Sequence, residues 1–171
     1  MNRPIKSSPT LQTIKVKTAD GARKHFRGHR VAYGNSGGER QFCPVGGRSF
    51  RVDIYQLDTG NYVAVIIYTT RTGNEWASKK VTMAPPTDAN NRPGVASCTL
   101  LDLLSHLSMD IDPVECSGLL PDGMKVDQSF GLEDEAIHVR TLWEEAMSKV
   151  MSRLGLDPVI AAGTKLLLSL Q

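Results

Sequence analysis

Several features that would place this chain in a specialised class are missing from its 171 residues. No stretch approaches the roughly 18 consecutive apolar residues of a membrane span, and the N-terminus lacks the apolar run of a signal peptide. The three cysteines, Cys43, Cys98 and Cys116, are far apart and form no CxxC pair. These absences predict a cytoplasmic protein with no membrane partner and no disulfide framework.

Motifs for the common cofactors and metals are also missing. The sequence has no Walker loop, no dinucleotide-binding fingerprint after a strand and no kinase motif. His25 and His29 have a spacing that pairs two ligands on a helix, but the surrounding pattern predicts a strand, where they would stand about 13 Å apart. The carboxylates at Asp110, Asp112 and Glu115 do not align with a calcium-binding loop. We therefore predict no cofactor and no metal, and a non-enzymatic role.

One short segment matches a catalytic pattern. Residues 34–38, Gly-Asn-Ser-Gly-Gly, fit the G-x-S-x-G form and are similar to the run around chymotrypsin-type serines. A nucleophile elbow needs a helix after the serine, and the following residues 39–44 are poor at starting one. We predict a flexible glycine-rich loop, and keep a hydrolase with Ser36 as nucleophile as an alternative.

What the chain does have is a strongly uneven charge. Residues 1–86 carry 14 Lys/Arg against 5 Asp/Glu, a net charge of +9, and residues 87–171 carry 6 against 13, a net charge of −7. Together these give the overall +2. Such asymmetry indicates a charged partner.

The basic half has the pattern of an antiparallel sheet. Segments 13–17, 29–33, 49–57, 62–68 and 76–83 are expected as strands, and turn residues at 58–61 and 71–74 join the last three into two consecutive hairpins. Residues 1–10 form a flexible basic arm ahead of this half, which spans 11–83. Prolines and asparagines make 84–96 a linker.

The acidic half, 97–171, is predicted to be helical. Thr99 and Asp102 suggest a capping box for a helix over about 99–108, and a loop-rich stretch follows from about 109 to 130. Apolar residues spaced by three and four from Leu132 to Leu154 predict one long helix, and Asp157-Pro158 begins a last one. The expected fold is α+β, with a sheet of four to six strands and about three helices on one of its faces, in one compact domain.

The basic half suggests that the protein binds nucleic acid, DNA or RNA. Cations release phosphate counterions, glycines allow close backbone approach, and aromatic side chains such as Phe26 and Tyr33 stack on bases. The predicted phosphate contacts are Arg23, Lys24, Arg27, Arg30, Arg48, Arg51, Lys79 and Lys80. This hypothesis requires those cations to gather on a single open surface of the folded protein.

A protein partner is the alternative. The acidic helices of one copy could meet the basic sheet of another in a homodimer, or the protein could act as a regulatory accessory subunit or a small inhibitor. The segment from 159 to 170 is apolar on all sides, so it must be buried in its own core or in a partner. Its candidate partner contacts are Leu166, Leu167 and Leu170.

Overall fold

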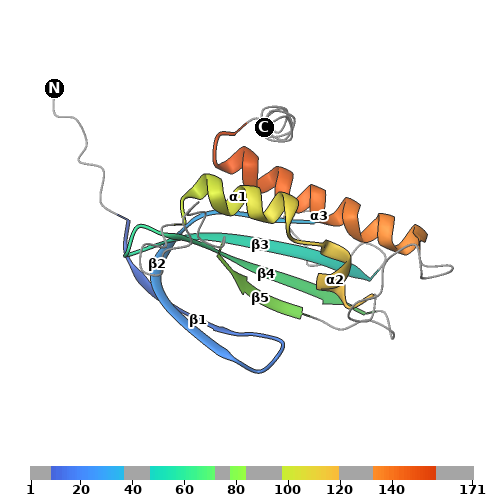
Figure 1. Cartoon of the computed structure of the whole chain (residues 1–171), viewed down its shortest axis with the longest axis horizontal. Helices are drawn as coiled ribbons and strands as arrows, with labels where there is room; N and C mark the ends of the chain where they lie inside the picture. Colours follow the sequence, from blue (N-terminus) through green and yellow to red (C-terminus); the bar gives the residue numbers. More distant parts are fainter. Residues whose placement is uncertain (1–8, 37–46, 72–77, 84–97, 120–132, 157–171) are drawn as a thin grey trace, which may run out of the picture.

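Five antiparallel strands in chain order form the sheet of this protein. The computed structural model describes residues 9–36, 47–71, 78–83, 98–119 and 133–156. The strands are β1 (Gln12–Lys17), β2 (Arg23–Asn35), β3 (Arg48–Leu57), β4 (Tyr62–Thr70) and β5 (Ser78–Thr82). Their order in the sheet is β1-β2-β3-β4-β5, so each strand pairs with its neighbour in sequence. The predicted α+β fold with an antiparallel meander is confirmed (Figure 1).

The hairpin of β3 and β4 is the centre of the sheet. Its pairing runs from Arg48 opposite Thr70 to Gln56 opposite Tyr62. At the turn Gly60 has a φ of 86°, a conformation that glycine adopts without steric cost. In β4, Val63 and Val65 are buried on one face of the sheet and Ile66 on the other, as expected for a strand with neighbours on each side.

β2 is much longer than the sequence pattern predicted. The strand begins at Arg23 rather than near His29, and it contains a bulge between Arg30 and Ala32. The first part of β2, residues 23–30, lacks a clear alternation of apolar and polar residues. Its side chains on one face are polar, and its opposite face is only partly buried. β1 pairs with β2 only as far as Gly28, so the rest of β2 has no strand on that side among the described residues.

The sheet curls so that the first hairpin approaches the last strand. In Figure 1, β1 and β2 bend away from the helices and pass below the sheet. The amide of Ala19, in the turn between β1 and β2, donates a hydrogen bond of 3.1 Å to the carbonyl of Lys79 in β5. We call the side enclosed by this curl the concave face; it carries Arg51, Asp53 and Tyr55 of β3.

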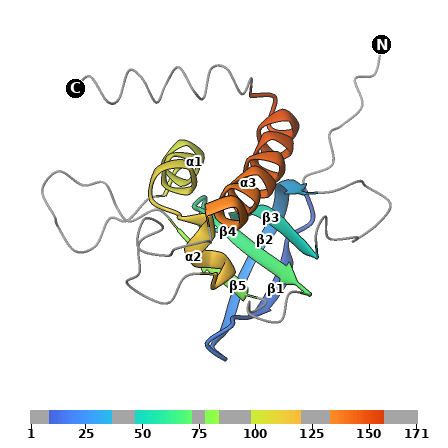
Figure 2. The same cartoon turned by 90° about the vertical axis from the view of Figure 1, so that its right-hand side faces the viewer.

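The other face of the sheet is covered by the helices. They are α1 (Leu100–Met109), α2 (Pro113–Ser117) and α3 (Glu133–Arg153). α3 lies across β2 and β3, whereas α1 and α2 lie over β4 (Figure 2). The expected capping box of α1 is present: Thr99 accepts from the amide of Asp102, and the Asp102 side chain accepts from the amide of Thr99. None of the described helices is both long and apolar enough to cross a membrane.

α2 was not predicted as a helix. Asp112 caps it by accepting a hydrogen bond of 2.8 Å from the amide of Val114, and Pro113 occupies the first turn. The Asp-Pro pair was interpreted as loop chemistry, although it is equally the pattern of a helix start. A helix of five residues is too short to be stable alone. Val114 and Ser117 are buried, so packing against the rest of the protein stabilises it.

The main core lies between α3 and the helix-covered face of the sheet. The predicted apolar stripe of α3 is buried at every described position from Ala136 to Val150. The ring of Trp143 meets Phe50 edge-on, with 5.3 Å between the ring centroids. A smaller buried group on the concave face, Val16, Val63 and Val65, is covered by the curl of the first hairpin.

Some predicted segments lie outside the described residues. They are the first eight residues of the arm, the linker at 84–96, Leu132, and the last helix with its candidate partner contacts Leu166, Leu167 and Leu170.

Candidate nucleic-acid interface

The register of the first hairpin places four cations together. Lys17 pairs with Arg23, Lys15 pairs with His25, and Thr13 pairs with Arg27. Because side chains alternate along a strand, Lys15, Lys17, Arg23 and Arg27 stand on the same side of the hairpin. This side is opposite to Phe26, whose ring contacts Tyr55 on the concave face at a centroid distance of 5.5 Å. All four cations are exposed; we call them the hairpin cation patch.

Within the described part of the chain, no carboxylate forms an ion pair with the patch. The nearest acidic residue in sequence, Asp20, is engaged in the hairpin turn. It accepts hydrogen bonds from the Thr18 hydroxyl and from the amide of Ala22. The bond from Thr18, and then the bond from Ala22, hold the pKa of Asp20 below its ordinary value. Asp20 therefore stays a carboxylate that fixes the turn, and its hydrogen bonds go to the turn rather than to the cations of the patch.

The structure does not gather the eight cations predicted from sequence onto one surface, so the condition set for that track of contacts is not met. Arg23 and Arg27 belong to the patch, but Lys24 and Arg30 stand on the concave side of β2. Arg51 and Lys79 share a register row through Ile67 and also face the concave side. Lys80 lies on the helix-covered face, where its charge opposes the upward shift that burial gives the pKa of the Cys116 thiol.

Arg48 is buried beneath the start of α3. The residue is 7% exposed, and its guanidinium lies 3.9 Å from the carboxylate of Glu135 at the start of α3. Here the acidic helix covers a cation of the basic half of the same chain. We therefore leave Arg48 out of the proposed contact surface.

Sequence reasoning missed Lys15 and Lys17. The signal was present, because Thr-Ile-Lys-Val-Lys alternates over residues 13–17 and Gly21 marks a turn. Gly21 has a φ of 83° in the structure. Pairing this segment with the charged run after the turn would have placed both lysines beside Arg23 and Arg27.

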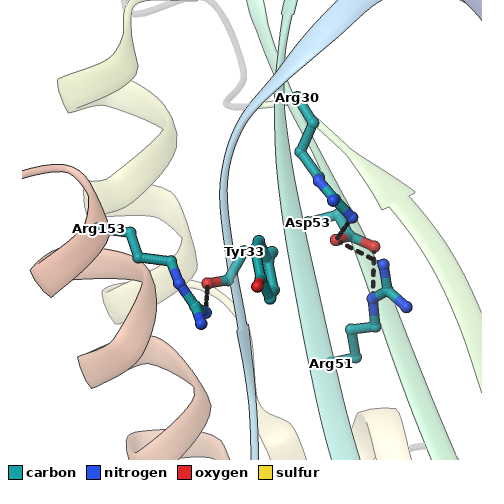
Figure 3. A network of polar contacts seen from close by, with 5 residues as sticks. All are labelled: Arg30, Tyr33, Arg51, Asp53 and Arg153. Carbon is teal, nitrogen blue, oxygen red and sulfur yellow. Dashed lines mark hydrogen bonds and ion pairs between the residues drawn. The ribbon is translucent and has the colours of Figure 1, made fainter. Parts of the chain in front are cut away.

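Arg30, Arg51 and Asp53 form a separate polar network on the concave face (Figure 3). Asp53 is 3% exposed. Arg51 approaches Asp53 with two nitrogens, Nε at 2.9 Å from Oδ2 and Nη2 at 3.1 Å from Oδ1, and Arg30 Nη1 lies 3.3 Å from the same Oδ1. A buried carboxylate needs such partners to remain charged.

Two cations of α3 cover the edge of β2 next to this network. Arg153 donates to the carbonyl of Tyr33 and stacks on its ring, 3.7 Å from the centroid, and Arg30 lies 4.6 Å from the same centroid. Lys149 Nζ donates to the carbonyl of Asn35 at 2.7 Å. These contacts satisfy carbonyls that lack a neighbouring strand, which protects the edge from pairing with another chain.

Ser36 has a structural role in this fold. Its hydroxyl accepts a hydrogen bond of 2.8 Å from the amide of Phe50, and its own amide donates to the carbonyl of Phe50 at 2.9 Å. The side chain is buried and closes the pairing of β2 with β3. Among the described residues no imidazole hydrogen-bonds to it, so the alternative of a serine nucleophile gains no support from the geometry.

A hydroxyl, an imidazole and a carboxylate meet between β5 and α1. His106 Nε2 lies 3.1 Å from Thr82 Oγ1, and His106 Nδ1 lies 3.0 Å from Asp110 Oδ2. In a catalytic triad the carboxylate is buried and the hydroxyl is accessible. Here the exposure is reversed, with Thr82 at 9% and the Asp110 side chain at 62%. The arrangement ties β5 to α1 rather than presenting a nucleophile.

The described residues contain no group of three or more His, Cys, Asp or Glu side chains placed to hold a metal ion. Comparisons with protein-family models, with curated proteins and with solved structures found no match.

Proposed function

We propose that this protein binds nucleic acid through the hairpin cation patch, Lys15, Lys17, Arg23 and Arg27. The observation that supports this most is four exposed cations on one side of a hairpin, with no ion-paired carboxylate among the described residues. Such groups gain by neutralising phosphates, because each contact releases condensed counterions. A partner rich in phosphates fits this surface better than a neutral one.

The spacing of the patch suits an extended phosphate backbone. Lys15 and Lys17 are about 6.6 Å apart along β1, Arg23 and Arg27 are about 13 Å apart along β2, and the two strands are about 4.8 Å apart, so the four cations lie within about 14 Å of one another. His25 is exposed opposite Lys15 and offers a ring on which a base can stack. Nothing in the patch reads base edges, so the proposed binding is insensitive to sequence.

Charge reversal tests this proposal. We expect Arg23→Glu combined with Arg27→Glu to weaken binding to a single-stranded oligonucleotide at least about tenfold at low salt, equally for unrelated sequences. Fluorescence anisotropy with labelled DNA and RNA measures the affinity. Both side chains are exposed and lie away from the helix layer, so circular dichroism should show an unchanged fold.

Lys24→Glu combined with Lys79→Glu is the matched control. It makes the same change in net charge, but on the concave side, and we expect it to alter affinity far less than the double arginine variant. Equal losses for both variants would show that overall charge, not the patch, determines binding. An absence of binding to DNA and RNA at low salt would favour the protein-partner alternative.

A further inference from the structure

The network on the concave face holds more positive charge than its buried carboxylate neutralises. Arg30 and Arg51 both contact Asp53, and Asp53 supplies one negative charge. Asp53 lies underneath, with its side chain 5% exposed, whereas the side chains of Arg30 and Arg51 are 42% and 31% exposed. The carboxylate therefore anchors two guanidinium groups whose outer parts reach solvent.

The two guanidinium groups are also close to each other. Arg30 Nη1 and Arg51 Nη2 hydrogen-bond to the same oxygen, Asp53 Oδ1. A guanidinium has five N–H donors, and Asp53 engages only the inner nitrogens of this pair. Both side chains are partly exposed, so donors that Asp53 does not engage can reach solvent, and the planar fork of a guanidinium matches the oxygens of an oxyanion.

Neighbouring side chains hold the pair in place and add donors. In Figure 3 the Tyr33 ring lies between Arg153 on one side and the Arg30–Asp53–Arg51 network on the other. Tyr55 lies opposite Arg30 in the register. Burial, and then the charge of Asp53, raise the pKa of the Tyr55 phenol. The phenol therefore keeps its proton at neutral pH and can donate.

We propose that Arg30 and Arg51, held by the buried carboxylate of Asp53, form a binding site for a phosphate group on the concave face. A tetrahedral phosphate presents oxygens to both guanidinium groups at once, and its negative charge more than offsets the one excess positive charge of the network. A planar carboxylate also carries enough charge to offset that excess, but it has only two oxygens to share between the two groups. This site is separate from the hairpin cation patch, which stands on the opposite side of the first hairpin, and does not depend on nucleic-acid binding there.

Titration with inorganic phosphate tests the site directly. Isothermal titration calorimetry and the ³¹P linewidth at constant ionic strength should show saturable binding of phosphate and weaker binding of acetate. Arg30→Gln should weaken phosphate binding at least about tenfold, since it removes one charged hydrogen-bonding partner. The substituted side chain is partly exposed and the contact of Arg51 with Asp53 remains, so the fold should persist.

Arg51→Lys is the second variant, because it keeps the charge and loses the planar fork. We expect it also to weaken phosphate binding, whereas Arg23→Gln in the hairpin cation patch should leave phosphate binding unchanged. Failure of phosphate to bind, equal affinity for acetate, or unchanged affinity in both Arg30→Gln and Arg51→Lys would overturn the proposal.

The source of the phosphate group is resolved by competition. An oligonucleotide with a 5′-phosphate that displaces inorganic phosphate, where the unphosphorylated strand does not, would identify a strand end as the ligand. No displacement by either strand would identify a small phosphate compound. Both results are consistent with the proposed site. A failure to bind inorganic phosphate would overturn it.

Discussion

Replacing Trp143 with alanine is expected to lower the free energy of unfolding by about 3–5 kcal/mol, the usual cost of deleting a large buried aromatic side chain. Trp143 is 6% exposed and lies in the middle of α3, facing the sheet. Its ring contacts Phe50, which in turn lies 4.8 Å from Tyr68 between ring centroids. The substitution therefore opens a cavity where α3 packs on β3. Urea denaturation followed by circular dichroism measures the change.

Ile137→Ala on the same helix is the matched control. Ile137 is 59% exposed, so we expect a change within about 0.5 kcal/mol. A loss below about 1 kcal/mol for Trp143→Ala would contradict the packing of α3 on the sheet described above.

Gly34→Ala should be nearly as damaging, with an expected loss of about 3 kcal/mol, the upper end of the usual cost of overpacking. A Cβ at this position of β2 would lie 1.9 Å from the carbonyl oxygen of Ala146 and 3.0 Å from a methyl group of Val150. The first obstacle is backbone, so no rotamer change relieves it. α3 would have to move away from the sheet. Thermal or urea denaturation reports the loss.

Gly60→Ala provides the comparison. A Cβ at Gly60 meets nothing within 4 Å, but its φ of 86° makes any side chain strained. That conformation costs about 1–2 kcal/mol. We therefore expect Gly34→Ala to be the more destabilising of the two. A smaller loss at Gly34 than at Gly60 would mean that α3 approaches β2 less closely than described.

Much of the fold was predictable because its elements follow simple periodicities. The β-branched run 62–68 and the alternating run 49–57 formed the expected central hairpin, and the apolar spacing of 136–150 formed the expected long helix. α2 and the first half of β2 were missed. α2 is too short to show a helical period in the sequence, and packing of Val114 stabilises it. In β2, the polar residues of the first hairpin obscure the alternation expected of a strand.

The candidate site was only partly predictable, because a charge count does not tell on which face of a strand a side chain stands. The bulge between Arg30 and Ala32 changes the alternation along β2, and the acidic helix α3 covers Arg48. The buried carboxylate of Asp53 gave no sequence signal, since a charged residue that alternates with the apolar residues of a strand is typical of a solvent-facing position. The register of the strands and the curl of the sheet decide which cations are exposed and share a face. Both depend on pairing between residues that are far apart in the sequence.

The salt dependence of nucleic-acid binding tests the central claim most directly. If the four cations of the hairpin cation patch each neutralise one phosphate of a single strand, the logarithm of affinity should fall with the logarithm of salt concentration with a slope of about −3, at roughly −0.7 per contact. Arg23→Gln combined with Arg27→Gln should reduce the slope to about half of that value. A slope near zero, or one that the double variant leaves unchanged, would contradict the claim.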